Sequence, residues 1–306
     1  MYPNFLILGP PKCASTSLHY YLGQHPDIYT SKIKETNFFS LQYQKGLEFY
    51  NGYFDEAKNK KIIGEATPSY AFLPYVAERI KQHFPEMKLI LCFRNPAERA
   101  FSSWLMHSGM GAEPCGFREA IEKNLLQMKE ITFEGEEGER IWIRASSNNY
   151  NAKTRIRTYV QGGMYAQILE TYLNHFPQGQ IKIIFLEDLR LAFTKTIADV
   201  FEFLGVETTF VVKNKAEVNY YINRKANRIT NTIFGIDKTR AIVKHIPAPL
   251  KNFLKKKMVK PPPKLDEEDR IFLWNIFKDD IARLEKILKR DLSIWTSAKY
   301  KAATSV

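Results

Sequence analysis

The sequence predicts a three-layer α/β protein, in which helices cover both faces of a central parallel sheet. Four short apolar runs bounded by turn residues or charges indicate the strands, at residues 5–8, 62–64, 88–93 and 181–186. Their hydrophobicity does not alternate, which is typical of strands covered on both faces. Segments with helical periodicity separate these runs, and such alternation favours parallel strands joined by right-handed crossovers.

The helical segments follow in chain order at residues 15–24, 74–83, 96–107, 164–176 and 194–204. Pro96 fits the first turn of the helix that it opens. In open sheets of this kind, ligands bind at the carboxyl ends of the strands. Lys12, Glu65 and Arg94 all fall at such ends, so we expect a site there.

The chain of 306 residues is predicted to form a single domain, residues 1–306. Residues 109–151 are expected to be an inserted region with a helix near 117–129 and an exposed acidic loop at 134–139, either a lid or a plain solvated loop. Residues 223–306 are expected to form a basic loop and a C-terminal helical segment packed on the same domain. Within it, the periodicity of residues 266–289 predicts a closing helical hairpin.

The formal net charge of +12 indicates a polyanionic partner, such as nucleic acid, a membrane surface, a nucleotide or an anionic polysaccharide. Three cysteines without metal-like spacing argue against a disulfide scaffold and a zinc site. The first predicted strand begins too early for a secretory signal, and no apolar run reaches the roughly 20 residues that span a bilayer. We therefore expect a soluble cytoplasmic protein without stable membrane insertion.

The most informative segment is residues 6–18, which reads as a buried strand, a tight loop that contains Lys12, and a helix opened by Ser15, Thr16 and Ser17. Unpaired N–H groups and the positive end of the dipole make such a helix start an anion site, and a phosphate is the expected guest. The segment is P-loop-like, but Gly-Lys-Ser/Thr, the magnesium-binding pattern of Walker A loops, is absent from the sequence.

Two further segments could carry chemistry. Residues 94–102 place Arg94 at a strand end and Ser102 further into the next helix, an arrangement that can hold a second phosphate, although isolated arginines are more often ion-pair partners. Residues 31–39 place Glu35 beside lysines and before an aromatic pair, and a carboxylate in a cleft can take a proton from a hydroxyl.

At this point the residues resemble a known family, the sulfotransferases that use 3′-phosphoadenosine 5′-phosphosulfate (PAPS). Pro-Lys-Cys-Ala-Ser-Thr-Ser-Leu at 11–18 is similar to their 5′-phosphosulfate loop, and Arg-Asn-Pro-Ala-Glu-Arg-Ala-Phe-Ser at 94–102 to their 3′-phosphate motif. Lys-Glu-Thr-Asn-Phe-Phe at 34–39 resembles the heparan-sulfate-type branch. Residues 163–165 and 186–189 also resemble family segments, and the tail from 261 to 295 resembles bacterial members.

The resemblance implies transfer of a sulfuryl group from PAPS to a hydroxyl or amine of a saccharide or small-molecule natural product, with PAP as the product and no metal. It implies that Glu35 is the general base and that Lys12 stabilises the departing 5′-phosphate. The implied nucleotide-binding residues are Lys12, Cys13, Ala14, Ser15, Thr16, Ser17, Arg94, Ser102 and Arg224. His107 is the alternative base.

The sequence departs from the family pattern at two places. Ala14 and Ser15 stand where Gly-Thr is usual, and since alanine takes a positive φ only at a cost, we expect ordinary backbone angles there. Ala66 stands where some heparan sulfate members have lysine, which weakens the case for a glycosaminoglycan acceptor.

Two other functions stay open at this point. A P-loop kinase of small molecules shares the strand, loop and helix. A non-enzymatic binder of polyanions would use the basic segment 224–260 and would show steeply salt-dependent binding. The sulfotransferase prediction includes no nucleic-acid partner.

Overall fold

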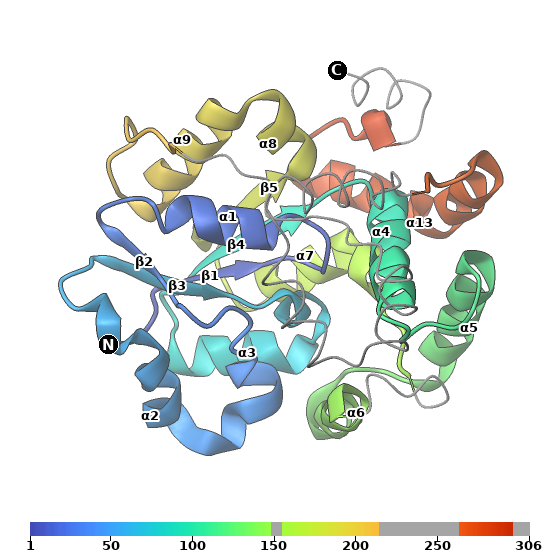
Figure 1. Cartoon of the computed structure of the whole chain (residues 1–306), viewed down its shortest axis with the longest axis horizontal. Helices are drawn as coiled ribbons and strands as arrows, with labels where there is room; N and C mark the ends of the chain where they lie inside the picture. The colour runs from blue at the N-terminus through green and yellow to red at the C-terminus, as the bar shows by residue number, and fades with distance from the viewer. Residues whose placement is uncertain (148–154, 214–262, 296–306) are drawn as a thin grey trace, which may run out of the picture.

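The computed structural model describes residues 1–147, 155–213 and 263–295 (Figure 1). Five parallel strands form one sheet in the order β2-β3-β1-β4-β5. The strands are β1 Phe5–Leu8, β2 Ile28–Thr30, β3 Ile62–Ala66, β4 Lys88–Phe93 and β5 Ile181–Phe185. The predicted parallel α/β fold is therefore confirmed, and β2 is a strand that the sequence analysis missed.

Helices cover both faces of this sheet. The α-helices are α1 Ser15–Leu22, α2 Gly46–Asn51, α3 Pro74–His83, α4 Pro96–Gly109, α5 Phe117–Glu130, α6 Gly135–Ser147, α7 Tyr165–Leu173, α8 Leu186–Leu191, α9 Phe193–Leu204 and α13 Glu267–Leu288. Short 3₁₀ or π segments lie at Phe38–Gln42, Tyr43–Lys45, Gly52–Ala57, Pro68–Phe72, Gln161–Gly163, Gln178–Gln180 and Ser293–Trp295. In Figure 1, α1, α8 and α9 lie on one side of the sheet and α2 and α3 on the other, which gives the three layers.

The central strand β1 is buried along its whole length, between β3 and β4. Gly64 lets β3 approach it, because a Cβ there would lie 2.4 Å from the carbonyl oxygen of Phe5. The parallel register pairs Leu6 with Glu65 and Ile7 with Ala66. The carboxyl ends of β1 and β3 therefore meet at one edge of the sheet.

Two sequence-based expectations are wrong. The acidic segment 134–139 is not an exposed loop, because α6 begins at Gly135 and carries Glu136 and Glu137 in its first turn. Carboxylates are favourable there because they face the positive end of the helix dipole. Glu139 is buried and receives a 2.5 Å ion pair from Arg79 of α3, so this part of α6 packs against the core.

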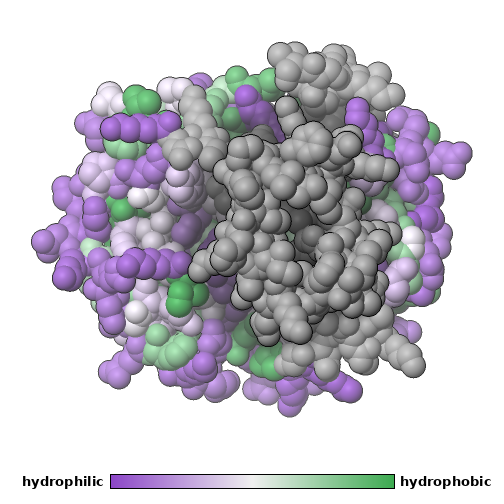
Figure 2. All heavy atoms as spheres, in the orientation of Figure 1, coloured by the Kyte–Doolittle hydropathy of each residue, from purple (hydrophilic) through white to green (hydrophobic). Residues whose placement is uncertain are grey.

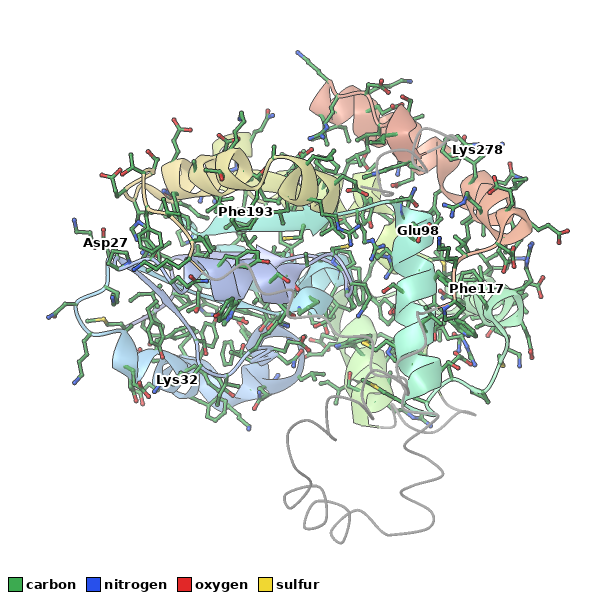
Figure 3. All side chains as sticks on the ribbon, turned by 45° about the horizontal axis from the view of Figure 1, so that its top comes forward. Asp27, Lys32, Glu98, Phe117, Phe193 and Lys278 are labelled. Carbon is green, nitrogen blue, oxygen red and sulfur yellow. The ribbon has the colours of Figure 1, made fainter. Side chains whose placement is uncertain are left out.

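The second correction concerns residues 266–289, which form one long helix, α13, and not a hairpin. Asp280 of α13 accepts hydrogen bonds from the N–H groups of Ala166 (2.9 Å) and Gln167 (3.3 Å) in α7. Ion pairs also join Arg270 of α13 to Glu98 of α4 at 2.8 Å and Asp269 of α13 to Arg118 of α5 at 2.6 Å. Figure 3 shows α4, α5 and α13 together at one end of the sheet.

The visible surface is mainly hydrophilic where the structure describes it, with small separate apolar patches (Figure 2). Single exposed apolar side chains of this kind are ordinary in folded proteins. Within residues 1–147, 155–213 and 263–295, none of the helices has the length and apolar character needed to cross a bilayer.

Candidate active site

The loop from Gly9 to Ala14 joins β1 to α1 and has an unusual backbone. Lys12 has a φ of 80°, and Ala14, the N-cap residue of α1, has a φ of 68° and a ψ of 15°. The expectation of ordinary angles at Ala14 is therefore wrong. A left-handed alanine costs about 1–2 kcal/mol. The buried side chains of Cys13 and Ala14 hold the loop in this form, so tertiary packing overrides the local preference.

The start of α1 is suited to an anion. Ala14 makes no side-chain capping bond, so the first-turn N–H groups of Ser15, Thr16 and Ser17 receive no cap from it. Ser15 and Ser17 are buried, and Thr16 is partly exposed. Unpaired N–H groups at the positive end of a helix favour a phosphate or sulfate, and a phosphate here stays a prediction.

Arg94, which follows β4, joins this loop to the next strand. Its Nη1 donates to the carbonyl oxygen of Lys12 at 3.2 Å. Burial, and next the Arg94 charge, lower the pKa of Lys12 from its usual value. Lys12 and Arg94, predicted separately from two motifs, are therefore brought together at the carboxyl ends of β1 and β4.

Arg99, on the first turns of α4, adds a third cation and is only 1% exposed. Its guanidinium donates to the carbonyl oxygen of Tyr159, while its Nε and the Nε of Arg94 are buried without a hydrogen-bond partner in the described part of the chain. Among the described residues, Lys12, Arg94 and Arg99 form no ion pair with a carboxylate. Since a buried charge without a counter-charge is costly, this cluster has the electrostatics of an anion-binding site.

The helix that carries Arg99 and Ser102 is fixed at its start by Asn95. The Asn95 side chain accepts from the N–H groups of Ala97 (3.0 Å) and Glu98 (3.1 Å), while its Nδ2 donates to the carbonyl oxygen of Trp295 at 3.0 Å. Its backbone N–H donates to Glu187 at 2.9 Å. Ser102 is partly exposed two turns further along α4. Asn95 is not among the site residues predicted from the sequence, although Asn-Pro before a helix is a known capping signal.

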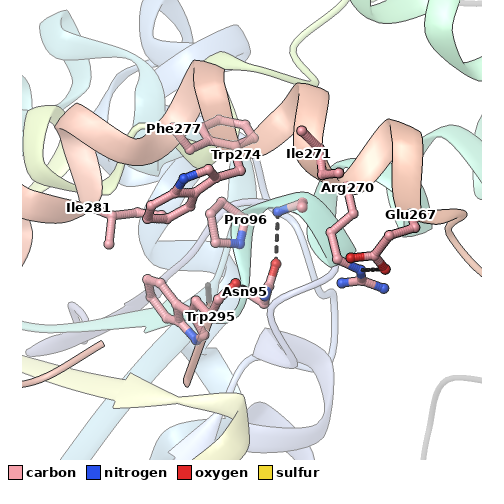
Figure 4. A pocket seen from close by; sticks show the side chains of 10 residues that line it. Asn95, Pro96, Glu267, Arg270, Ile271, Trp274, Phe277, Ile281 and Trp295 are labelled. Carbon is pink, nitrogen blue, oxygen red and sulfur yellow. Dashed lines mark hydrogen bonds and ion pairs between the residues drawn. The ribbon is translucent and has the colours of Figure 1, made fainter. Parts of the chain in front are cut away.

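Figure 4 shows a pocket beside the start of α4, where Asn95 and Pro96 face α13 and Trp295. The wall is mainly apolar and aromatic, from Ile271, Trp274, Phe277, Ile281 and Trp295, with Glu267 and Arg270 at one end. Packing against α13 and Trp295 thus supports the helix that presents Arg99.

Glu35 lies on a segment anchored to the end of β3. Its N–H donates to the carbonyl oxygen of Ala66 at 3.0 Å, and its φ is 61°. Asn37, with a φ of 52°, donates from Nδ2 to the Glu35 carbonyl oxygen at 2.7 Å. The Glu35 side chain is 51% exposed and pairs with Lys34 at 2.5 Å. A carboxylate at this edge of the sheet is accessible to a substrate.

Glu65, the penultimate residue of β3, has a larger part in the structure than its position at a strand end predicted. Its carboxyl is fully buried, and it accepts from Thr36 Oγ1 at 3.0 Å and from Thr67 Oγ1 at 2.7 Å. Burial raises its pKa to about 7, against the lowering effect of the hydroxyl donors. The sequence predicted only that Glu65 lies at a strand end, because nothing in the local pattern indicates this network.

The other predicted site residues differ in their surroundings. Burial, and next Arg155, lower the pKa of His107 to about 3, so its imidazole is neutral at physiological pH and gains little by taking a proton. Burial raises the pKa of the Cys13 thiol to about 11, and its Sγ lies 3.7 Å from Tyr165 Oη. Arg224 and the basic segment 224–260 lie outside the described residues.

Residues 2–260 match the family described as the sulfotransferase domain. The chain is 26% identical over 297 residues to the human bifunctional heparan sulfate N-deacetylase/N-sulfotransferase 2, covering 94% of this chain and 30% of that protein. It is 40% identical over 105 residues to the membrane-associated sulfotransferase kil1 of Dictyostelium discoideum, covering 33% of this chain and 22% of that protein. The chain thus spans less than a third of the length of either relative.

Among solved structures, a sulfotransferase from Alicyclobacillus acidocaldarius superposes with a TM-score of 0.68 and 26% sequence identity. The superposition covers 97% of this chain and all of that chain. The similarity therefore extends over nearly the whole chain.

Proposed function

The chain belongs to the sulfotransferase domain family, and from this membership we propose that it transfers the sulfuryl group of PAPS to a hydroxyl or amine of a saccharide or small molecule. The observation that carries the choice of donor is the cluster of Lys12, Arg94 and Arg99, which has no carboxylate ion-pair partner in the described chain. A nucleotide with phosphate groups at both 5′ and 3′ positions supplies the missing negative charge.

The two ends of the cluster suit the two ends of this nucleotide. Lys12 and the start of α1 are proposed to hold the 5′-phosphosulfate, with N–H and hydroxyl donors from residues 13–17. Arg94 and Ser102 are proposed to hold the 3′-phosphate, the group that distinguishes PAPS from ATP. The rival P-loop kinase would need a Gly-Lys-Ser/Thr site for magnesium, which the sequence lacks.

In the proposed step, Glu35 takes the proton of the acceptor while the acceptor oxygen or nitrogen forms a bond to sulfur. The bond between sulfur and the bridging oxygen of the 5′-phosphate breaks in line, and its electron pair stays on the phosphate of PAP. Lys12 stabilises that charge. Positioning and electrostatic stabilisation would supply most of the rate enhancement.

The acceptor class is supported by the relatives. Human bifunctional heparan sulfate N-deacetylase/N-sulfotransferase 2 acts, by its name, on the nitrogen of a polysaccharide, which supports a saccharide amine or hydroxyl. Ala66, in place of the lysine of some heparan sulfate enzymes, favours an acceptor other than a glycosaminoglycan. A screen of acceptors with labelled PAPS, with labelled ATP in parallel, tests both donor and acceptor. Cytoplasmic location and the lack of a nucleic-acid partner stay predictions.

Glu35→Gln tests the base. We expect kcat to fall by roughly 10²–10⁴-fold, since a general base contributes about that much, while the Kd of PAP by calorimetry stays unchanged. Glu56→Gln is the matched control, because Glu56 is also an exposed glutamate paired with a lysine, Lys32. Wild-type turnover by Glu35→Gln would show that this assignment is wrong. His107→Gln measured alongside tests the alternative base.

A further inference from the structure

The buried carboxyl of Glu65 lies at the centre of a hydrogen-bond network with two layers. In the first layer, Thr36 Oγ1 and Thr67 Oγ1 donate to its two oxygens at 3.0 and 2.7 Å, and Tyr50 Oη donates at 3.5 Å. Thr36, Thr67 and Tyr50 are themselves buried. The carboxyl of Glu65 is therefore held by donors from α2, from the segment before Phe38 and from the residue that follows β3.

The second layer reaches the backbone that follows Glu35. The N–H of Asn37 donates to Thr67 Oγ1 and the N–H of Phe38 donates to Thr36 Oγ1, each at 3.4 Å. A threonine hydroxyl has one proton, so when it donates to Glu65 its lone pairs face these N–H groups. The direction of the whole chain of hydrogen bonds thus depends on Glu65 as an acceptor.

The segment held in this way is strained. Glu35 and Asn37 both have positive φ values, 61° and 52°, which residues other than glycine adopt at a cost. Such a conformation persists when the surroundings determine it. The Glu35 N–H is fixed by Ala66, and Thr36 and Thr67 fix the N–H groups of Phe38 and Asn37. Further bonds to the same segment come from Asn37 Nδ2 to the Glu35 carbonyl oxygen, from Gln42 Nε2 to the Thr36 carbonyl oxygen and from Ser69 Oγ to Asn37 Oδ1.

We propose that Glu65 is a positioning residue whose ionised carboxylate orients Thr36 and Thr67 and so holds the Glu35 side chain where it can accept the proton of the acceptor. The proposal rests on the function proposed above. When Glu65 is protonated, its O–H must donate to an oxygen, and a threonine that accepts it has one lone pair fewer for the backbone N–H. Protonation of Glu65 therefore loosens the Glu35 segment.

The groups that face Glu65 bring the protonation of its carboxyl close to neutral pH. Burial is the main influence and raises the pKa of Glu65 to about 7, while Thr67, Thr36, Tyr70 and the Lys34 charge act in the opposite direction. Tyr50 and Tyr70 face it from α2 and from Pro68–Phe72, and burial raises the pKa of both phenols well above the usual value, so they stay neutral donors. Lys34 is the cation on the same segment as Glu35.

The test is the pH dependence of kcat in Glu65→Gln, which keeps the shape of the side chain and cannot ionise. We expect the wild-type kcat to rise through about pH 7 and the variant to lack this rise, so that its kcat is roughly 10-fold lower at about pH 8 and within about twofold of the wild type at about pH 6. The Kd of PAP is expected to match the wild type throughout. A purely structural role would lower kcat by one factor at every pH.

Thr36→Val and Thr36→Ser test the path from Glu65 to Glu35. We expect Thr36→Val to lower kcat at about pH 8 without changing the Kd of PAP, and Thr36→Ser, which keeps the hydroxyl, to restore it. Thr196→Val is the matched control, because Thr196 of α9 is also buried and its hydroxyl donates to the carbonyl oxygens of Asp188 and Ala192. Its kcat profile is expected to match the wild type.

The outcomes separate this proposal from the proposed function. If Glu35→Gln is inactive while the pH profile of Glu65→Gln runs parallel to the wild type, the positioning role is overturned and the base assignment stands. If Glu35→Gln turns over normally, the base assignment fails, and the positioning role fails with it.

Discussion

Replacement of Asp280 by alanine tests how α13 is fixed to the rest of the domain. Asp280 is 4% exposed and accepts from the N–H groups of Ala166 and Gln167 at 2.9 and 3.3 Å, so a carboxylate on one helix caps the start of another. Met164, the N-cap residue of α7, makes no side-chain capping bond of its own. The capping function therefore belongs to Asp280.

The magnitude follows from the groups left behind in Asp280→Ala. Ala166 is buried, so its N–H is left without a partner, whereas Gln167 is exposed and its N–H can bond to water. An unpaired buried donor costs about 1–3 kcal/mol and a lost cap about 1 kcal/mol. We expect the free energy of unfolding to fall by roughly 2–4 kcal/mol. Arg283 is 53% exposed, and its pairing with Asp280 adds little to this figure.

Urea denaturation followed by circular dichroism measures this loss. Asp279→Ala is the matched control, since Asp279 is the exposed neighbour on the same helix, and we expect it to change the free energy of unfolding by less than about 0.5 kcal/mol. Equal unfolding free energies for the two variants would refute the capping role of Asp280. Asp280→Asn, which keeps one acceptor oxygen, is expected to fall between the wild type and Asp280→Ala.

Two further predictions concern the nucleotide loop and acid stability. Ala14→Val should lower the free energy of unfolding by about 1–3 kcal/mol and weaken PAP binding in calorimetry, because a β-branched residue is strained at a φ of 68°. Ala14→Gly, which carries no such strain, should keep PAP binding. Equal PAP affinities for the two variants would contradict this prediction. Folding lowers the pKa of His107 to about 3 and that of His19 to about 4. Between about pH 6.5 and 4 the unfolded chain therefore binds more protons than the folded chain, so the free energy of unfolding falls as the pH drops through this range. The raised pKa of Glu65 acts in the opposite direction, but this effect is common to the wild type and His107→Gln. The urea midpoint should therefore fall less in His107→Gln than in the wild type between about pH 7 and pH 4.5. An equal fall of the midpoint in both proteins would contradict the lowered pKa of His107.

Strands that are buried on both faces are recognisable from the sequence because their hydrophobicity is continuous. The predicted ranges 5–8 and 88–93 agree with β1 and β4, and α3 begins and ends as predicted at Pro74 and His83. Strand β2 was missed because Ile28–Thr30 is only three residues long, too short for a periodic pattern. The hairpin predicted at 266–289 is wrong because these residues include no glycine or proline to make a turn, so the helical periodicity continues as one helix.

The sequence by itself identified the candidate site residues, since Lys12, Arg94, Ser102 and Glu35 are recognisable from motifs that follow the ends of strands. Only the tertiary structure decided the left-handed backbone of Ala14, the cap that Asp280 gives to α7, and the network around Glu65. Each of these depends on contacts between residues far apart in the chain, as between Asp280 and Ala166. Local sequence propensities carry no information about such contacts. Packing in the folded chain holds Ala14 in a strained conformation, and burial raises the pKa of the Glu65 carboxyl.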